Sequence, residues 1–200
     1  MKRNWLNSFG NRLVNNIDLK SLLLSSDSVL VKIPSSLYNQ STSFIPSLLS
    51  DQMLCYITLN KTYNSLKTRF KKEEIPSDKI VYIDAITKSM EPVENTQDCY
   101  FVSSPQALTE LSIVASEFLA QNIDFVILDS LTTLLIYQKK IDPVVKFVTK
   151  MVNTSKKENS HMIFFVLDTP EHQLLIEESS MVMDSVYTFS EDTLSVSKTA

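Results

Sequence analysis

Apolar runs and amphipathic stretches alternate along most of this chain. The apolar runs are short and rich in β-branched or aromatic residues, and they lie at 28–33, 53–59, 79–84, 124–129 and 161–168. Such runs predict strands, and the last two are so apolar that we expect both faces of their sheet to be covered. The alternation predicts an α/β fold, a three-layer α/β/α sandwich around a mainly parallel sheet.

The segments between these runs predict the helices. Residues 62–73 place Tyr63, Leu66 and Phe70 on one helical face, with lysines opposite. Further helices are expected at 42–51, from Ser104 with Pro105 at its first helical position, and from Asp142-Pro143 to about Lys157. Residues 99–104 are expected to add a short strand and 85–98 a surface loop, and the segments "SVYTFS" (185–190) and "TLSVSK" (193–198) are expected to form an antiparallel edge pair.

The first 24 residues form a separate amphipathic region. Trp5, Phe9, Leu13 and Ile17 recur at four-residue spacing, with basic residues nearby. Such a stripe usually faces a core, so we expect it to pack on the sheet of the domain itself. The alternative is a helix that binds a partner or a membrane surface. Residues 25–200 are expected to form one domain, because neither a linker nor an internal repeat is visible.

Composition narrows the possible functions. The chain has one glycine, Gly10, where average usage predicts roughly fourteen, so motifs that need several glycines are excluded. The net charge of −4 disfavours nucleic acid as a partner. Two cysteines and the lack of a signal peptide or membrane span predict a cytoplasmic protein from a reducing compartment.

Several segments together resemble the RecA/KaiC-like branch of the P-loop ATPases, in particular the short archaeal KaiC-like proteins. The run "FVILDSLTTLLIY" looks like the Walker B strand, and "MLCYITLNKTYNSLKTRFKKEEI" resembles the strand and helix after the phosphate loop. "IVYIDAITKS" and "SSPQALTELSIVASEFL" resemble the next strand and helix, and the similarity covers roughly residues 25–190. The resemblance implies a RecA-like P-loop NTPase fold.

The segment "PSSLYNQSTSF" occupies the place of the phosphate loop but lacks its chemistry. Against the family pattern G-x-x-x-x-G-K-[ST], Ser35 and Gln40 fall at the glycines, Ser41 at the lysine and Thr42 at the magnesium-binding hydroxyl. Glycines let backbone N–H groups close on the phosphates, and the lysine supplies charge to them. Serine does neither well. For Ser41 and Thr42 the alternative is ordinary capping at a helix start.

A second departure lies after the following strand. Where the family carries an acidic residue that activates water, this chain has Asn60 and Lys61, and an asparagine cannot accept a proton at neutral pH. Asp129 is retained at the end of the Walker B-like strand. It would bind magnesium only if a nucleotide shared the ion; otherwise it is expected to be a helix N-cap or a polar plug.

These losses favour a degenerate domain that does not hydrolyse nucleotide, has no cofactor and no resident metal, and acts as a regulatory or scaffold protein in signalling. A protein partner or homo-oligomer is expected, by analogy with relatives that stack edge to edge. One alternative is a divergent ATPase that binds ATP with Mg²⁺ through Thr42, Asp129 and a lysine such as Lys32 or Lys61. A third hypothesis, a RecA-type DNA-repair accessory, is disfavoured by the acidic balance.

Other chemistry is less favoured. The two histidines, His161 and His172, belong to no metal-ligand pattern, and a Ser–His–Asp site lacks its nucleophile elbow. The basic residues between Lys61 and Lys79 are expected to form a solvated helix face balanced by Glu73 and Glu74. Tyr137, Lys139 and Lys140 are expected in a loop over the sheet edge where ligands or partners bind.

Overall fold

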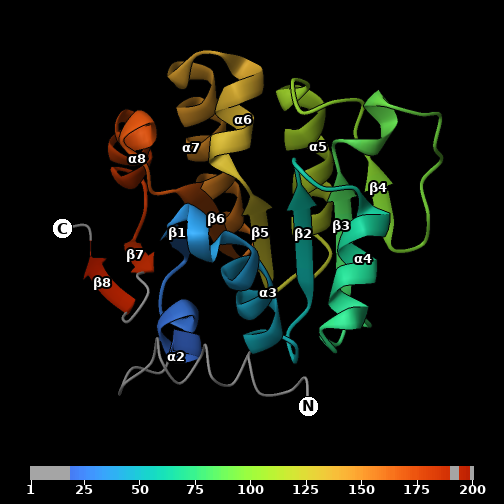
Figure 1. The fold of residues 1–200 in the computed structure, drawn as a ribbon, viewed down its shortest axis with the longest axis horizontal. Helices are drawn as coiled ribbons and strands as arrows, with labels where there is room; N and C mark the ends of the chain where they lie inside the picture. The colour runs from blue at the N-terminus through green and yellow to red at the C-terminus, as the bar shows by residue number, and fades with distance from the viewer. Residues whose placement is uncertain (1–18, 190–193, 199–200) are drawn as a thin grey trace.

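The fold is a three-layer α/β/α sandwich, as the sequence predicts. A computed structural model describes residues 19–189 and 194–198, so the predicted helix at the N-terminus lies almost wholly outside the described residues. One sheet runs through the molecule with the strand order β4-β3-β2-β5-β6-β1-β7-β8 (Figure 1). Neighbouring strands from β4 to β7 pair in parallel, and β8 joins β7 antiparallel, as expected for the closing edge pair.

The strands follow the predicted apolar runs closely. Their bounds are β1 Ser28–Ile33, β2 Leu54–Thr58, β3 Ile80–Asp84, β4 Cys99–Phe101, β5 Phe125–Asp129, β6 His161–Leu167, β7 Ser185–Phe189 and β8 Leu194–Lys198. Every residue of β2 and β5 is buried, because these strands lie in the middle of the sheet with helices on both faces.

The helices divide between the two faces of the sheet, and each face has its own apolar core. On one face lie α2 Leu19–Leu24, α3 Tyr38–Leu48 and α4 Tyr63–Lys72. On the other lie α5 Leu108–Leu119, α6 Leu131–Gln138, α7 Ile141–Lys157 and α8 Gln173–Ser180. Alternate strand residues supply the two cores: Val29, Val31 and Ile33 point to the first and Leu30 to the second.

Three local predictions were wrong. The helix expected at 42–51 begins at Tyr38, directly after a 3₁₀ turn at Ser35–Leu37. The helix expected after Pro105 begins at Leu108, because Ser104 Oγ instead accepts a hydrogen bond from the Gln106 N–H and closes a turn. The loop expected around Tyr137 is the end of α6, where Lys139 terminates the helix in the left-handed region.

The first described helix belongs to the body of the fold. Leu19 and Leu23 of α2 are buried in the first core, and the Tyr187 hydroxyl donates to the Leu22 carbonyl at 2.9 Å. These contacts tie α2 to β7 and extend the folded unit at least to residue 19.

Candidate functional site

The segment after β1 folds as a helix and not as an open loop. Pro34 is extended, and the N–H groups of Leu37 and Tyr38 then donate to the carbonyls of Pro34 and Ser35. A phosphate loop must instead aim such N–H groups at its ligand. Here they close the turn that starts α3, so they are directed into the protein's own backbone.

The four residues aligned with the phosphate-loop motif are split between solvent and core. Ser35 and Gln40 are exposed, whereas Ser41 and Thr42 are buried. Within the described residues the Ser41 hydroxyl has no hydrogen-bond partner. The Thr42 hydroxyl donates to the Asn39 carbonyl at 3.3 Å and accepts from the Arg69 guanidinium at 3.3 Å. Both residues lie inside α3, so neither is at the helix start.

Asp129 is the centre of a hydrogen-bonded cluster at the carboxyl ends of β2 and β5. Its carboxylate is fully buried. The Tyr38 hydroxyl and the Asn60 side-chain amide donate to Oδ1, the latter at 3.0 Å, and the Tyr56 hydroxyl donates to Oδ2 at 2.7 Å. Asn60 also donates to the Tyr38 oxygen at 3.0 Å. We call these four residues the Asp129 cluster.

This geometry matches one of the two non-catalytic roles expected for Asp129. The helix that follows β5 is capped by Ser130, whose hydroxyl accepts from the Thr133 N–H, so Asp129 is not the N-cap. The carboxylate instead fills the sheet edge as a polar plug. Its acceptor positions face donors of the same chain, which is how buried carboxylates are normally stabilised.

Electrostatics keep the donors protonated. Burial, reinforced by the nearby Asp129 carboxylate, raises the pKa of Tyr38 and of Tyr56 far above the value of a free tyrosine. Both phenols therefore remain O–H donors at any physiological pH. Lys61 lies beside the cluster, 5.6 Å from the centre of the Tyr38 ring, and burial lowers the pKa of its ammonium group.

Sequence reasoning brought together part of this site. It paired Asn60 with Asp129, and the structure places them in contact. It also grouped Thr42 with Asp129, yet no hydrogen bond joins these two among the described residues; Thr42 contacts Arg69 instead. The two tyrosines were missed. Tyr38 stands inside the loop-like segment, and Tyr56 is a phenol in an otherwise apolar central strand, which is the signal that could have found it.

A second aspartate at the same sheet edge has a purely local role. Asp84 is fully buried and accepts from the N–H groups of Tyr63, Ile86 and Thr87 at 2.6–2.9 Å. The Thr87 hydroxyl adds a fourth bond at 2.5 Å. Asp84 therefore fastens the first turn of α4 to the segment after β3.

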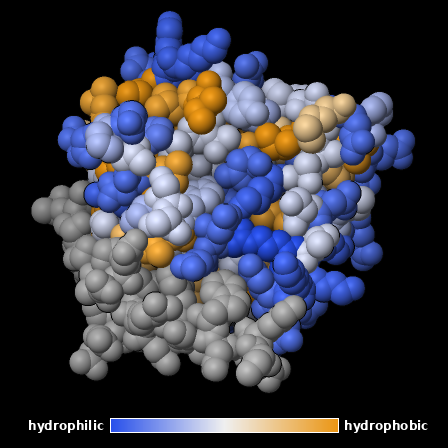
Figure 2. Space-filling view, in the orientation of Figure 1, coloured by the Kyte–Doolittle hydropathy of each residue, from blue (hydrophilic) through white to orange (hydrophobic). Residues whose placement is uncertain are grey.

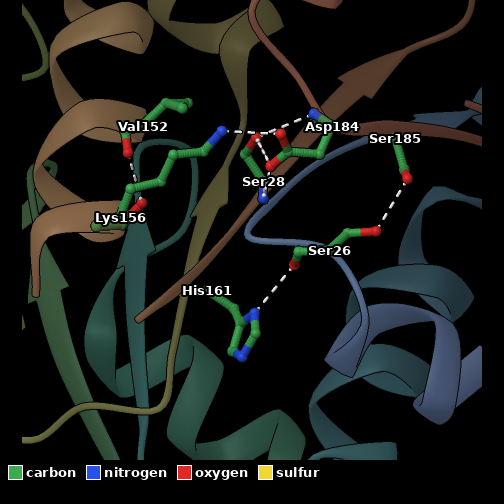
Figure 3. A network of polar contacts seen from close by, with 8 residues as sticks. Ser26, Ser28, Val152, Lys156, His161, Asp184 and Ser185 are labelled. Carbon is green, nitrogen blue, oxygen red and sulfur yellow. Dashed lines mark hydrogen bonds and ion pairs between the residues drawn. The ribbon is translucent and has the colours of Figure 1, made fainter. Parts of the chain in front are cut away.

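Serine, histidine and aspartate residues also lie together at the amino ends of the strands, but not as a catalytic triad (Figure 3). The His161 ring bonds the Ser26 carbonyl at 2.9 Å, and the Ser26 hydroxyl pairs with that of Ser185. Asp184 accepts from both the N–H and the hydroxyl of Ser28 and pairs with Lys156 at 2.8 Å. These bonds tie the starts of β1, β6 and β7 together, and the hydrogen bond of the His161 ring joins it to a backbone carbonyl and not to the hydroxyl of a nucleophile.

The described part of the chain has neither a cluster of side chains suited to a metal ion nor a helix suited to crossing a bilayer. In residues 19–189 and 194–198, no group of three or more His, Cys, Asp or Glu side chains is arranged to hold a metal ion. Over the same residues, none of the helices has the length and apolarity needed to cross a membrane.

Comparison with solved structures identifies the fold. The chain is similar to the KaiC-like protein of the hyperthermophilic archaeon Pyrococcus horikoshii OT3, with a TM-score of 0.58 and 11% identity, covering 86% of this chain and 78% of that one. At that identity the likeness shows the fold alone, and it confirms the predicted RecA/KaiC-like architecture. No family model and no characterised protein matches the sequence.

Proposed function

We propose that this protein is a RecA/KaiC-like domain that does not hydrolyse nucleotide and that works as a regulatory or scaffold protein through contacts with other proteins. The observation that carries the proposal is the Asp129 cluster. In a magnesium–nucleotide site this carboxylate would face the ion. Here Tyr38, Tyr56 and Asn60 already donate hydrogen bonds to its two oxygens. Binding a metal ion there would break these three hydrogen bonds.

The lost phosphate loop supports the same proposal. The backbone N–H groups at the start of α3 are used within the helix and its 3₁₀ turn, and no lysine occupies the segment 34–44. A triphosphate would therefore meet neither a cradle of N–H donors nor the cation that the family pattern supplies.

A surface around α6 supports the role in protein contacts. One cleft beside this helix is lined by Leu135, Ile141 and Leu174 together with Lys139, Lys140 and Asp142. Another, on its other side, is lined by apolar residues such as Leu108 and Ile113 and by polar ones such as Glu110, Glu117 and Gln138. Ile136 is 66% exposed and Leu174 is 55% exposed. Hydrophobic side chains gather along the upper edge of the molecule, where α6 and α8 lie (Figure 2). Apolar exposure of this kind marks interaction surfaces.

The proposal is tested by thermal denaturation with ATP and Mg²⁺. A ligand at one hundred times its dissociation constant would stabilise the fold by about 2.7 kcal/mol. We expect millimolar Mg–ATP to leave the melting temperature unchanged and no phosphate to be released. A rise that requires Mg²⁺ and disappears in Asp129→Asn would contradict the proposal and favour the ATP-binding alternative.

The partner surface needs its own test. Protein purified from native cells is compared with Ile136→Asp and with Lys150→Asp, which changes an exposed position farther along α7. We expect a stoichiometric partner, or a second copy of the chain, to be lost only from Ile136→Asp. Equal retention in both variants would show that this surface is not the one used.

A further inference from the structure

A third cleft lies between α3 and α4. Its volume is about 770 Å³, within the range of small-molecule sites. The lining side chains are all polar or charged, and among them are Asn39, Lys61, Arg69, Lys72 and Glu73. Every lining side chain ends in a polar or charged group, while aliphatic stems supply much of the exposed area, so the cleft suits a polar molecule that can also contact those stems.

Two cations converge inside this cleft on one neutral atom. Lys61 Nζ donates to Asn39 Oδ1 at 3.0 Å, and Arg69 Nη1 approaches the same oxygen at 3.4 Å. An amide oxygen carries no net charge, so the repulsion between the two cations is only partly relieved. An anionic oxygen at this point would be bound by both charges.

The Arg69 side chain is held in place for such a role. Its Nε pairs with Glu73 Oε1 at 3.3 Å, and its Nη1 also reaches the Thr42 hydroxyl at 3.3 Å. The guanidinium is mostly buried, with 17% of the side chain exposed. A charged group fixed in this way loses little conformational freedom when a ligand arrives.

The charge balance limits the ligand. Lys61, Arg69 and Lys72 face the cleft together with Glu73 and Glu74, which leaves an excess of one positive charge. One phosphate group carries about −1.5 to −2 at neutral pH and would leave at most about one negative charge uncompensated, whereas a triphosphate would leave several. The lining offers hydroxyls and amides but no aromatic ring on which a base could stack.

We propose that this cleft binds a hydrophilic phosphate monoester of the sugar-phosphate class, whose phosphate displaces the Asn39 amide oxygen from between Lys61 and Arg69. The inference does not depend on the proposed function. It assigns the cleft a ligand of its own, bound by side chains of α4 and by Lys61 beside the start of α3, and not by the backbone N–H groups through which a phosphate loop holds a nucleotide.

Isothermal titration of the full chain with ribose 5-phosphate tests the proposal, with ribose and gluconate as neutral and carboxylate probes. We expect ribose 5-phosphate to give a heat of binding and ribose and gluconate to give none. Because each charge-assisted bond contributes strongly, Lys61→Gln and Arg69→Gln should each weaken binding by about tenfold or more. The matched control is Lys71→Gln, which removes an exposed cation of α4 that does not line the cleft; it should change binding less than about twofold.

A further variant tests the displaced oxygen. Asn39→Ala removes the competing acceptor and should tighten binding, and circular dichroism verifies that each variant is folded. The proposal is overturned if millimolar ribose 5-phosphate does not bind, if gluconate binds equally well, if Lys71→Gln has the effect of Lys61→Gln, or if Asn39→Ala weakens binding tenfold.

The two proposals fail in different experiments. ATP binding that requires Asp129 would contradict the loss of the nucleotide site, whereas the cleft is tested by ribose 5-phosphate binding that requires Lys61 and Arg69. Absence of ribose 5-phosphate binding would remove the cleft's ligand and leave the proposed function standing.

Discussion

Replacing Asp129 with alanine tests whether its carboxylate stabilises the fold or serves only to bind a ligand. In this fold the substitution removes the acceptor of three hydrogen bonds. Tyr56 is fully buried and Tyr38 mostly so, and their hydroxyls would lose the carboxylate without solvent to replace it, whereas Asn60 is exposed and can turn to water.

The magnitude follows from these donors. A buried donor left unpaired costs about 1–3 kcal/mol, so the two tyrosines together predict a loss of about 2–6 kcal/mol. Removing a buried charge returns part of its desolvation cost, which lowers the expected net loss to about 3 kcal/mol. With a urea dependence of about 2 kcal/mol per molar, the unfolding midpoint should fall by about 1.5 M.

Asp168→Ala is the matched control. Asp168 follows the neighbouring strand β6 at the same edge of the sheet, but its carboxylate is 29% exposed and pairs with Lys32 at 3.4 Å. Such a pair contributes at most about 1 kcal/mol. If urea denaturation shows equal losses for the two variants, the cluster does not stabilise the fold and the reasoning behind it is refuted.

Three further predictions concern single groups. Tyr38→Phe removes one donor from Asp129 and should lower the free energy of unfolding by about 1–2 kcal/mol in urea; an unchanged midpoint would show that this bond contributes nothing. Although burial acts in the opposite direction, Lys156 and Ser28 hold the pKa of Asp184 below its ordinary value of 3.8. Its contribution to stability is therefore complete above that value and is lost as the pH falls through the lower, folded pKa, so Asp184→Asn should lessen the drop in urea midpoint between pH 6 and pH 3. Burial raises the pKa of the Cys55 thiol well above that of a free cysteine, so a thiol reagent at pH 8 should label it only after denaturation; rapid labelling of the native protein would contradict the buried position.

The sheet could be predicted because its signal is local. Every predicted strand forms, and all agree with their predicted bounds within one residue except β4, which ends at Phe101 instead of residue 104. The central strands are the clearest because a buried parallel strand must be apolar on both faces. The helix starts were less predictable. Pro105 resembles a first helical residue, but it lies in the turn that Ser104 closes before the helix begins. A turn of three residues is too short to show a periodic pattern in the sequence.

The candidate site could be predicted only as far as residue types allow. Missing glycines and a missing lysine are visible in the sequence, and so is the asparagine at position 60. What fills the resulting space is not visible, because the pairing of Tyr38 with Asp129 joins residues 91 positions apart. The same holds for Arg69, which lies on the helix face predicted to be solvated but has 17% of its side chain exposed.

The Asp129 cluster also explains how a fully buried carboxylate can be stable at this end of the sheet whether or not a ligand binds there. In an empty site, a buried carboxylate without donors would cost several kcal/mol, and selection for stability alone would replace it. Here Tyr38, Tyr56 and Asn60 supply permanent donors, so removing Asp129 would leave them unpaired in turn. Acceptor and donors therefore stabilise the fold as one unit. An aspartate at this position is thus insufficient evidence for magnesium chemistry unless the groups that face its oxygens are known.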